Sequence, residues 1–491
     1  MMLTGACMMR NGSIWRAALA LAVVASGTLA ANAALAAEPA LPAAGSDAGQ
    51  TAFRELFREM IETDTSVSTG NCSALAEKIA ARFRNAGFAA DQITLFRDPA
   101  IALDGGVVIT VPGRSKKARP MLLLGHIDVS SANPWHWKTD PFKLIERDGY
   151  FYGRGVADMK ALDAIWVDTL LRLRAEGFKP KRTIKLALTC GHESSAQANG
   201  AEWLVRRRPD LLDAQFALTE GGGGQIIGSG KAAIQTIAIG EMTTATFDIE
   251  TFSAGGPSSI PTDDNAISKM IDALWKVRAF KFPLHLNTAT RSYLAAVGAH
   301  RSDALGSAMV RLAADPSDAA AHTLVSADRF LNPLVHTTCL TTLIQGGFLV
   351  TAIPQTAKAT ISCYILPGED AEGTRTALFN AIGDPNLVMS RVGRVSPAPA
   401  EPPQDPRILR PAAKLIARYF QGMELVPATS LLATDGAYLA KLGVPVYGVP
   451  GLSFEPDGNS AHGHDERLAV RSTYIARNFL HDLVKVYAAQ K

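Results

Sequence analysis

Apolar residues in the first half of the chain recur in two alternating patterns, one helical and one extended. Helical spacing indicates helices at 50–62, 73–86, 161–176 and 201–207, and short apolar runs indicate strands at 106–111, 121–125, 183–189 and 215–219. Strands that alternate with helices predict an α/β fold with a mostly parallel sheet covered by helices. In such a sheet, a ligand site is expected beyond the carboxyl ends of the strands.

The pattern changes near residue 240. The next segments indicate strands at 243–252, 338–344, 357–365 and 387–395 and helices at 265–277 and 370–382, which together predict a smaller α+β domain. The Pro-rich segment 396–406 is typical of a linker. Helical spacing then returns at 409–420 and 472–489. We therefore expect a main domain of residues 37–240 and 398–491, interrupted by a domain of residues 241–397.

The N-terminus has the features of a cleaved targeting segment. Arg10 and Arg16 precede an apolar run over 17–35, and Ala34-Leu35-Ala36 fits a small-x-small cleavage site. We expect residues 1–36 to be a signal peptide and the mature chain to be periplasmic or secreted. No later segment is long and apolar enough to span a membrane, so no membrane association is expected after cleavage.

Composition narrows the class of protein further. The 491-residue chain has a net charge of +3, with 47% hydrophobic and 19% charged residues, as in an ordinary globular protein. It has no basic stripe, which argues against a nucleic acid as partner. The four cysteines beyond residue 36 are too few for a disulfide scaffold, and we interpret Cys190 as a buried structural thiol. None forms a Cys-x-x-Cys pair, so a metal site would use oxygen and nitrogen ligands.

Polar groups of metal-ligand type follow the predicted strands. His126 and Asp128 end the strand at 121–125, and Asp158 lies in the Gly-rich turn that opens the helix at 161–176. Imidazole and carboxylate are ligands of a zinc-like site. Because side chains alternate with period two along a strand, Asp128 shares a face with His126 and can orient it as a metal ligand.

Six motifs occur in order along the chain. They are Leu-Leu-Leu-Gly-His126-Ile-Asp128-Val, Asp140-Pro-Phe, Gly153-Arg-Gly-Val-Ala-Asp158-Met-Lys, Thr219-Glu220-Gly-Gly, Leu366-Pro-Gly and Ala461-His462-Gly. In these motifs the chain resembles the zinc peptidase family of aminoacylase, carboxypeptidase G and yeast carboxypeptidase S, from about residue 50 to the C-terminus. A series of six is far more specific than any one motif.

The resemblance implies two zinc ions, bridged by Asp158. His126 and Glu220 would complete one metal site, and Glu193 and His462 the other. Manganese or cobalt would suit the same ligands. The resemblance further implies hydrolysis of a peptide or small-molecule amide, as in a carboxypeptidase or an N-acyl-amino-acid amidohydrolase. It also makes the main domain catalytic and the inserted domain a lid, with a possible homodimer through that lid.

The loop after the strand at 183–189 departs from the family. The family has acid-Glu-Glu there, with a general base followed by a metal ligand, whereas this chain has Cys190-Gly-His192-Glu193-Ser194. Counted from the strand, His192 takes the place of the base and Glu193 that of the ligand. Counted back from Asn199, Glu193 would be the base and Ser194 would hold the ligand position. We favour the first count, because strand register resists slipping, and take His192 and Asp128 as the catalytic candidates.

The groups that recognise substrate in the family also differ. Pro257 stands where the family has a carbonyl-binding His, Thr351 replaces an Asn, and Tyr364 replaces an Arg that binds a substrate carboxylate. We take Tyr364 and Thr351 as substrate-binding candidates. A phenol in place of the guanidinium removes bidentate recognition of a carboxylate.

Three functions agree with these features. The first is an amide or peptide hydrolase with altered substrate recognition. The second is a metal-binding protein that has lost catalysis, which His192 and Pro257 favour. The third is a related enzyme that uses His192 for a different reaction at the same metals, because a histidine can transfer protons near neutral pH.

Overall fold

The structure is a computed structural model that describes residues 48–194, 198–227, 232–394, 396–397, 401–455 and 458–490. The expected signal peptide, residues 1–36, lies outside the described residues. None of the helices in these described ranges combines the length and apolar character that a membrane span requires.

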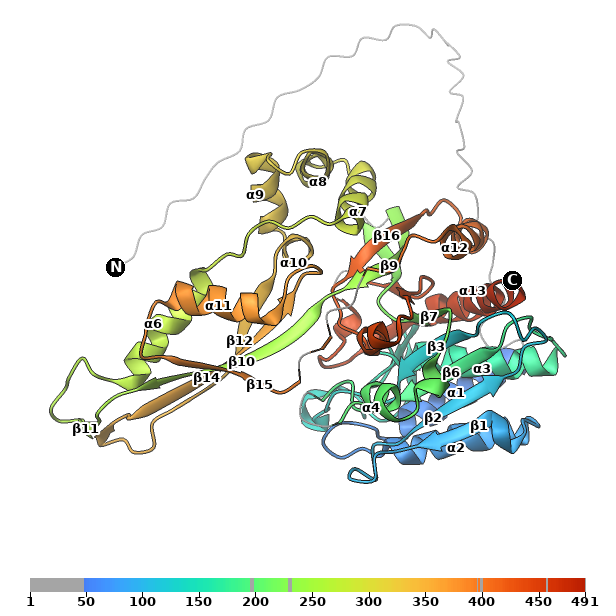
Figure 1. The fold of residues 1–491 in the computed structure, drawn as a ribbon, viewed down its shortest axis with the longest axis horizontal. Helices are drawn as coiled ribbons and strands as arrows, with labels where there is room; N and C mark the ends of the chain where they lie inside the picture. The colour runs from blue at the N-terminus through green and yellow to red at the C-terminus, as the bar shows by residue number, and fades with distance from the viewer. Residues whose placement is uncertain are drawn as a thin grey trace, which may run out of the picture. The chain divides into compact units, whose positions relative to one another are not determined.

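A ten-stranded sheet forms the main body of the fold (Figure 1). In spatial order its strands are β1 (Ile93–Phe96), β2 (Gly106–Val111), β6 (Ile184–Thr189), β3 (Met121–His126), β7 (Phe216–Thr219), β17 (Val446–Gly448), β9 (Ala232–Glu241), β8 (Gly223–Ile227) and β18 (Ser453–Phe454), while β16 (Leu425–Ser430) pairs with β9. The four strands β6, β3, β7 and β17 run parallel. The predicted α/β fold with a mostly parallel sheet is confirmed.

Alternating side chains along the buried strands explain why helices cover both faces of this sheet. Leu123 of β3 points into one hydrophobic cluster, and its neighbours Leu122 and Leu124 point into another. The first cluster is closed by α1 (Ala48–Glu62), α2 (Cys72–Asn85), α3 (Lys160–Ala175), α12 (Pro406–Tyr419) and α13 (Val470–Ala489). The second is closed by α4 (Gly200–Arg207), α5 (Pro209–Leu212) and the 3-10 helix η3 (Asp435–Leu442).

A four-stranded antiparallel sheet belongs to the inserted segment. Its order is β12 (Thr338–Gly346), β14 (Thr356–Ile365), β10 (Thr243–Phe252) and β15 (Val388–Val392). Helices α6 (Ala266–Ala279) and α11 (Ala371–Ile382) pack on one face of it, through a separate hydrophobic cluster (Figure 1). We call these elements the lid. The limits that we expect for the domains, 37–240, 241–397 and 398–491, stay a prediction.

Helices that the sequence patterns did not indicate lie between α6 and β12. They are α7 (Thr288–Ala299), α8 (Ala304–Ala314), α9 (Ala319–Ala327) and α10 (Asn332–Val335). Their apolar residues share a cluster with Ile234 of β9 and with Val426 and Ala428 of β16. This part of the inserted segment therefore packs on the large sheet.

Small β-ladders join segments that are distant in the sequence. One sheet pairs β4 (Ile145–Arg147) with β5 (Tyr150–Tyr152) and β5 with β19 (Arg467–Ala469), and another pairs β11 (Gly256–Pro257) with β13 (Ala352–Ile353). The short 3-10 helices are η1 (Ala90–Gln92), η2 (Pro134–His136) and η4 (Gly458–Ser460). The β5–β19 pairing holds the chain before Asp158 beside the chain after His462.

The interpretation of Cys190 as a free thiol is wrong. A disulfide bond links Cys190 to Cys72 at the start of α2, and a second links Cys339 of β12 to Cys363 of β14. Cys339 and Cys363 are direct register partners of neighbouring strands. Cys72 and Cys190 are 118 residues apart in sequence, so only the packing of α2 beside the end of β6 brings them together.

Candidate metal centre

His126 is the buried centre of the site. It ends β3, where only 1% of its surface is exposed. Its Nδ1 lies 3.0 Å from the backbone oxygen of Asp128, so Nδ1 carries the proton and donates it. Nε2 has no hydrogen-bond partner and faces Asp158 Oδ1 at 3.4 Å and Glu220 Oε1 at 3.5 Å. A ring nitrogen that faces two carboxylates without a hydrogen bond is placed as a metal ligand would be.

Asp158 lies between two histidines. Its Oδ1 faces His126, and its Oδ2 lies 3.1 Å from His462 Nε2. His462 Nε2 also lies 3.0 Å from Glu193 Oε1. The structure therefore brings together all five residues that the sequence predicted as metal ligands.

Parallel register explains how the strands deliver these groups. His126 of β3 is paired with Thr189 of β6, and Glu193 follows in the loop after Thr189. Glu220 comes directly after β7, the other parallel neighbour of β3. The carboxyl ends of three neighbouring strands therefore supply His126, Glu193 and Glu220 at one edge of the sheet.

The buried side chain of Glu466 joins the other two ligand segments. Its carboxylate accepts hydrogen bonds from the backbone N–H groups of Gly155, Ala157 and Asp158 and from Arg154 Nη1 at 2.8 Å. The His462 loop before it contains non-glycine residues with positive φ, including His462 at 60°. Glu466 thus holds a loop of unusual backbone conformation against the turn that carries Asp158.

Asp128 acts differently from the sequence prediction. Its carboxylate Oδ1 is 3.6 Å from His126 Nδ1, whereas its backbone oxygen makes the hydrogen bond to that ring. Its Oδ2 accepts the backbone N–H of Glu193 at 2.8 Å. Asp128 therefore links the His126 strand to the Glu193 loop, and the backbone rather than the carboxylate fixes the His126 ring.

The donor set and its spacing suit divalent metal ions. Ligand atoms on one tetrahedral ion with bonds of 2.0–2.1 Å lie roughly 3.3 Å apart. The four contacts among His126, Asp158, Glu193, Glu220 and His462 span 3.0–3.5 Å. The unpartnered Nε2 of His126 is the group that such an ion would satisfy.

The charges of the site also favour a bound metal ion. Asp158 and then Glu193 raise the pKa of His462 to about 10, against the effect of burial. Burial lowers the pKa of His126, but Asp128, Asp158 and Glu220 outweigh it and raise that pKa well above its ordinary value. Carboxylates that hold protons this firmly on two imidazoles also attract a metal ion, which would displace those protons.

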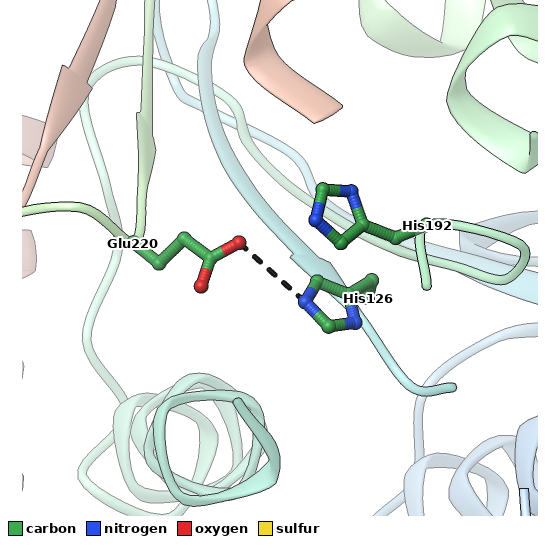
Figure 2. A group of neighbouring side chains, drawn as sticks. All are labelled: His126, His192 and Glu220. Atoms are coloured by element: carbon green, nitrogen blue, oxygen red, sulfur yellow. Dashed lines mark ion pairs between the residues drawn. The ribbon is translucent and has the colours of Figure 1, made fainter. Parts of the chain in front are cut away.

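His192 lies flat against His126. The ring centroids are 4.2 Å apart and the planes differ by 23°, and the Glu220 carboxylate faces both rings (Figure 2). A nitrogen of His192 and the ligand atoms of His126 and Glu220 all lie within 4.8 Å of one another. The two rings lie in separate, nearly parallel planes, so their nitrogen atoms do not converge on one point. The stacking therefore disfavours His192 as a further ligand of a metal that His126 would hold.

The positions of Glu193 and His192 bear on the two ways of counting the loop. Glu193 offers its carboxylate to His462, and it also forms a possible metal-binding group with His126 and Asp158. His192 occupies the adjacent position, next to the same ligands. This geometry favours the count in which Glu193 is the ligand and His192 stands where the family has its base.

The two substrate-binding candidates lie in different surroundings. Burial and the negative charges of Glu193 and Asp158 raise the pKa of Tyr364, so its phenol is within electrostatic reach of the ligands. Thr351 precedes β13, and its backbone oxygen accepts the N–H of Ser258, next to Pro257. This contact lies within the inserted segment, and the role of Thr351 in substrate binding stays a prediction.

Sequence patterns missed two residues of this site. Asp435, 2% exposed, bonds His192, and Glu466, 0% exposed, bonds the Asp158 turn. Glu466 stands four residues after His462, so its place in the same loop was a usable signal. Asp435 lies in a Thr-Asp-Gly turn at the start of η3. The sequence around it gives no sign of its contact with His192, which lies 243 positions earlier in the chain.

Comparison with known proteins gives one family. The profile described as "Peptidase family M20/M25/M40" matches residues 122–486. This range contains every residue that the sequence predicted for the site.

Individual proteins agree with the family match. Human N-fatty-acyl-amino acid synthase/hydrolase PM20D1 is 23% identical over 463 residues, which cover 91% of this chain and 89% of the human protein. The M20 family metallo-carboxypeptidase Sso-CP2 of Sulfolobus solfataricus has a similar fold, with a TM-score of 0.68, 15% identity and coverage of 89% of this chain and 99% of that one. The YXEP protein of Bacillus subtilis, a dinuclear metal binding peptidase from the M20 family, matches with a TM-score of 0.52, 15% identity and coverage of 89% and 98%.

Proposed function

The chain belongs to peptidase family M20/M25/M40, and from that premise we propose that this hydrolase of amide bonds uses two zinc ions to cleave N-acylated amino acids. One observation supports two ions above all others. The two oxygens of Asp158 face different histidines, His126 at 3.4 Å and His462 at 3.1 Å, and each histidine has its own second carboxylate. One carboxylate shared by two such groups suits a pair of bridged metals.

In the proposed amide hydrolysis, one set of residues would bind the metal ions and another would transfer the proton. Bound zinc ions would act as Lewis acids on the amide carbonyl and make water a better nucleophile. His126, Glu220, Glu193, His462 and the shared Asp158 would hold those ions. His192, beside them, is the group available to hold the proton of the attacking water and return it to the leaving nitrogen.

An apolar cavity supports an acyl group as part of the substrate. The cavity has a volume of about 370 Å³, and Glu220 is part of its wall, together with Ala238, Ala440, Val444 and Val446. Burial raises the pKa of Glu241, also in the wall, to about 8. Human PM20D1, by its name, acts on N-fatty-acyl-amino acids. Because Tyr364 replaces the family's Arg, we expect substrate binding to depend on the apolar acyl group, which the cavity would hold.

A chain-length series tests the proposal. We expect kcat/KM of the zinc-loaded mature chain to rise from N-acetyl to N-octanoyl and longer amino acids, because each buried methylene contributes about 0.8 kcal/mol. Ala440→Trp, which fills the cavity wall, should cost the long substrates about 10-fold or more and leave the acetyl compound unchanged. Lys441→Trp, exposed on the same helix and not in the wall, is the matched control. Equal rates for all lengths would contradict the proposed substrate.

The alternative function is a metal-binding protein without turnover, or one with different chemistry at the same metals. The replacement of the usual acidic base by His192 and the presence of Pro257 favour it. Two bound metals with no hydrolysis of N-acyl amino acids, dipeptides or neutral amides would support this alternative.

We also propose that the mature protein is periplasmic or secreted. The predicted signal peptide of residues 1–36 supports this location. The disulfides Cys72–Cys190 and Cys339–Cys363 support it independently, because such bonds persist mainly in oxidising compartments.

A homodimer through the lid is a further proposal. β12 is an edge strand of the lid sheet, and it exposes Leu340, Leu343 and Ile344, each to at least 59%. An unpaired edge with exposed large apolar side chains is typical of a protein interface.

A further inference from the structure

His192 makes a hydrogen bond that no sequence motif indicated. Its Nδ1 lies 2.9 Å from Asp435 Oδ1, across 243 residues of sequence. Since an ionised carboxylate only accepts, His192 Nδ1 carries the proton of this bond. The other nitrogen, Nε2, is then the one that His192 turns toward His126 and Glu220 (Figure 2).

Hydrogen bonds fix the buried carboxylate of Asp435. It is 2% exposed at the start of η3. Thr189 Oγ1 donates to its Oδ2 at 2.5 Å, and Asn199 Nδ2 donates to its Oδ1 at 2.6 Å. Thr189 ends the strand β6, and Asn199 is the N-cap of α4, so rigid elements fix both partners. A carboxylate fixed in this way can impose one orientation on the ring that it bonds.

We propose that Asp435 is a positioning residue for the reaction: it accepts the Nδ1–H of His192 and holds the ring with Nε2 toward His126 and Glu220. This inference rests on the proposed hydrolysis. It explains how a histidine can stand where the family has a carboxylate. A carboxylate presents equivalent oxygens in either orientation, whereas an imidazole needs a partner that selects one nitrogen.

The stacked ring of His126 restricts His192 further. The two rings are in face-to-face contact at 4.2 Å, so rotation of His192 is limited on one side by His126 and along its edge by Asp435. In the proposed reaction, Asp435 acts through His192.

The test combines kinetics with a direct view of the ring. In the zinc-loaded enzyme, Asp435→Asn should lower kcat by about 100-fold or more, with KM within a few-fold, because an amide no longer selects the ring nitrogen. Metal content should stay at the wild-type level. In a His192→Ala background the same Asn substitution should cost nothing more, because the group through which it acts is gone. The exposed Asp272→Asn on α6 is the control.

Nitrogen NMR of ¹⁵N-histidine-labelled protein reads the ring itself. The His192 signals, assigned by their loss in His192→Gln, should show the Nδ1-protonated form in the wild type and a changed form in Asp435→Asn. A wild-type ring protonated only at Nε2, or an equal kinetic loss in both backgrounds, would overturn the proposal. If no substrate is turned over, the proposed function fails by itself, while the NMR result still decides whether Asp435 fixes the ring.

Discussion

At the scale of single residues, Glu466 shows how one buried side chain can keep two candidate metal ligands, Asp158 and His462, together. It accepts four hydrogen bonds, three of them from the backbone around Asp158 and one from Arg154. Its side chain and that of Arg154 are 0% and 2% exposed. Loss of one partner of such a pair leaves the other buried without compensation.

We predict that Glu466→Gln destabilises the protein and weakens metal binding. The amide cannot accept from all four donors and leaves Arg154 uncompensated, so the free energy of unfolding should fall by about 3 kcal/mol. Chemical denaturation of the zinc-free and zinc-loaded protein measures both effects, with the exposed Glu62→Gln as control. Unfolding curves that match the wild type in both states would contradict this role of Glu466.

Some residues of the site could be recognised from the sequence around them, whereas others could not. His126, Glu193 and Glu220 could be predicted because each follows a buried strand of a parallel sheet. The partners of His192 and Cys190 could not, because Asp435 and Cys72 meet them only through tertiary packing. The atom of Asp128 that bonds His126 could not be predicted either, because the backbone oxygen makes the contact expected of the side chain, and a catalytic role of Asp128 stays a prediction.

At the scale of elements, the strands and long helices that the sequence patterns indicated agree closely with the structure, whereas strands such as β1, β9 and β16 of the large sheet were not indicated. The strand expected over 243–252 is β10, with the same limits, and the helix expected over 161–176 is α3, Lys160–Ala175. Helices α7, α8 and α9 were missed, although Asn287, Asp303 and Asp318 cap them. Their short, Ala-rich sequences give a weak apolar stripe, so only the capping residues carried the signal.

The exposed apolar side chains of the edge strand β12 lead to a prediction about dimer formation. Leu343 is 62% exposed on this strand, and a two-fold dimer would bury it against its own copy or a near neighbour. We predict that the wild type is a dimer and that Leu343→Glu weakens its association by about 100-fold, since like charges would face each other across the interface. Sedimentation velocity measures this. Leu103→Glu, exposed outside the lid, is the control, and a wild type that is monomeric at every concentration would contradict the proposed dimer.

At the scale of the whole molecule, both the large sheet and the lid carry residues that lie near the site. The sheet supplies His126, Glu193 and Glu220 from its strand ends, and the lid strand β14 supplies Tyr364. Arg394, just beyond the last lid strand, donates to the backbone oxygen of Gly191 in the loop of His192. The residues gathered around the site therefore come from segments that are far apart in the chain.

If two metal ions share Asp158, as we propose, the metal content of the purified mature chain will show it. Elemental analysis after dialysis against trace zinc should give two ions per chain for the wild type and for Asp272→Asn, and at most one for Asp158→Asn, because the amide cannot bridge two cations as a carboxylate does. A wild type that binds a single ion, or an Asp158→Asn variant that still binds two with unchanged affinity, would show that Asp158 is not shared in this way.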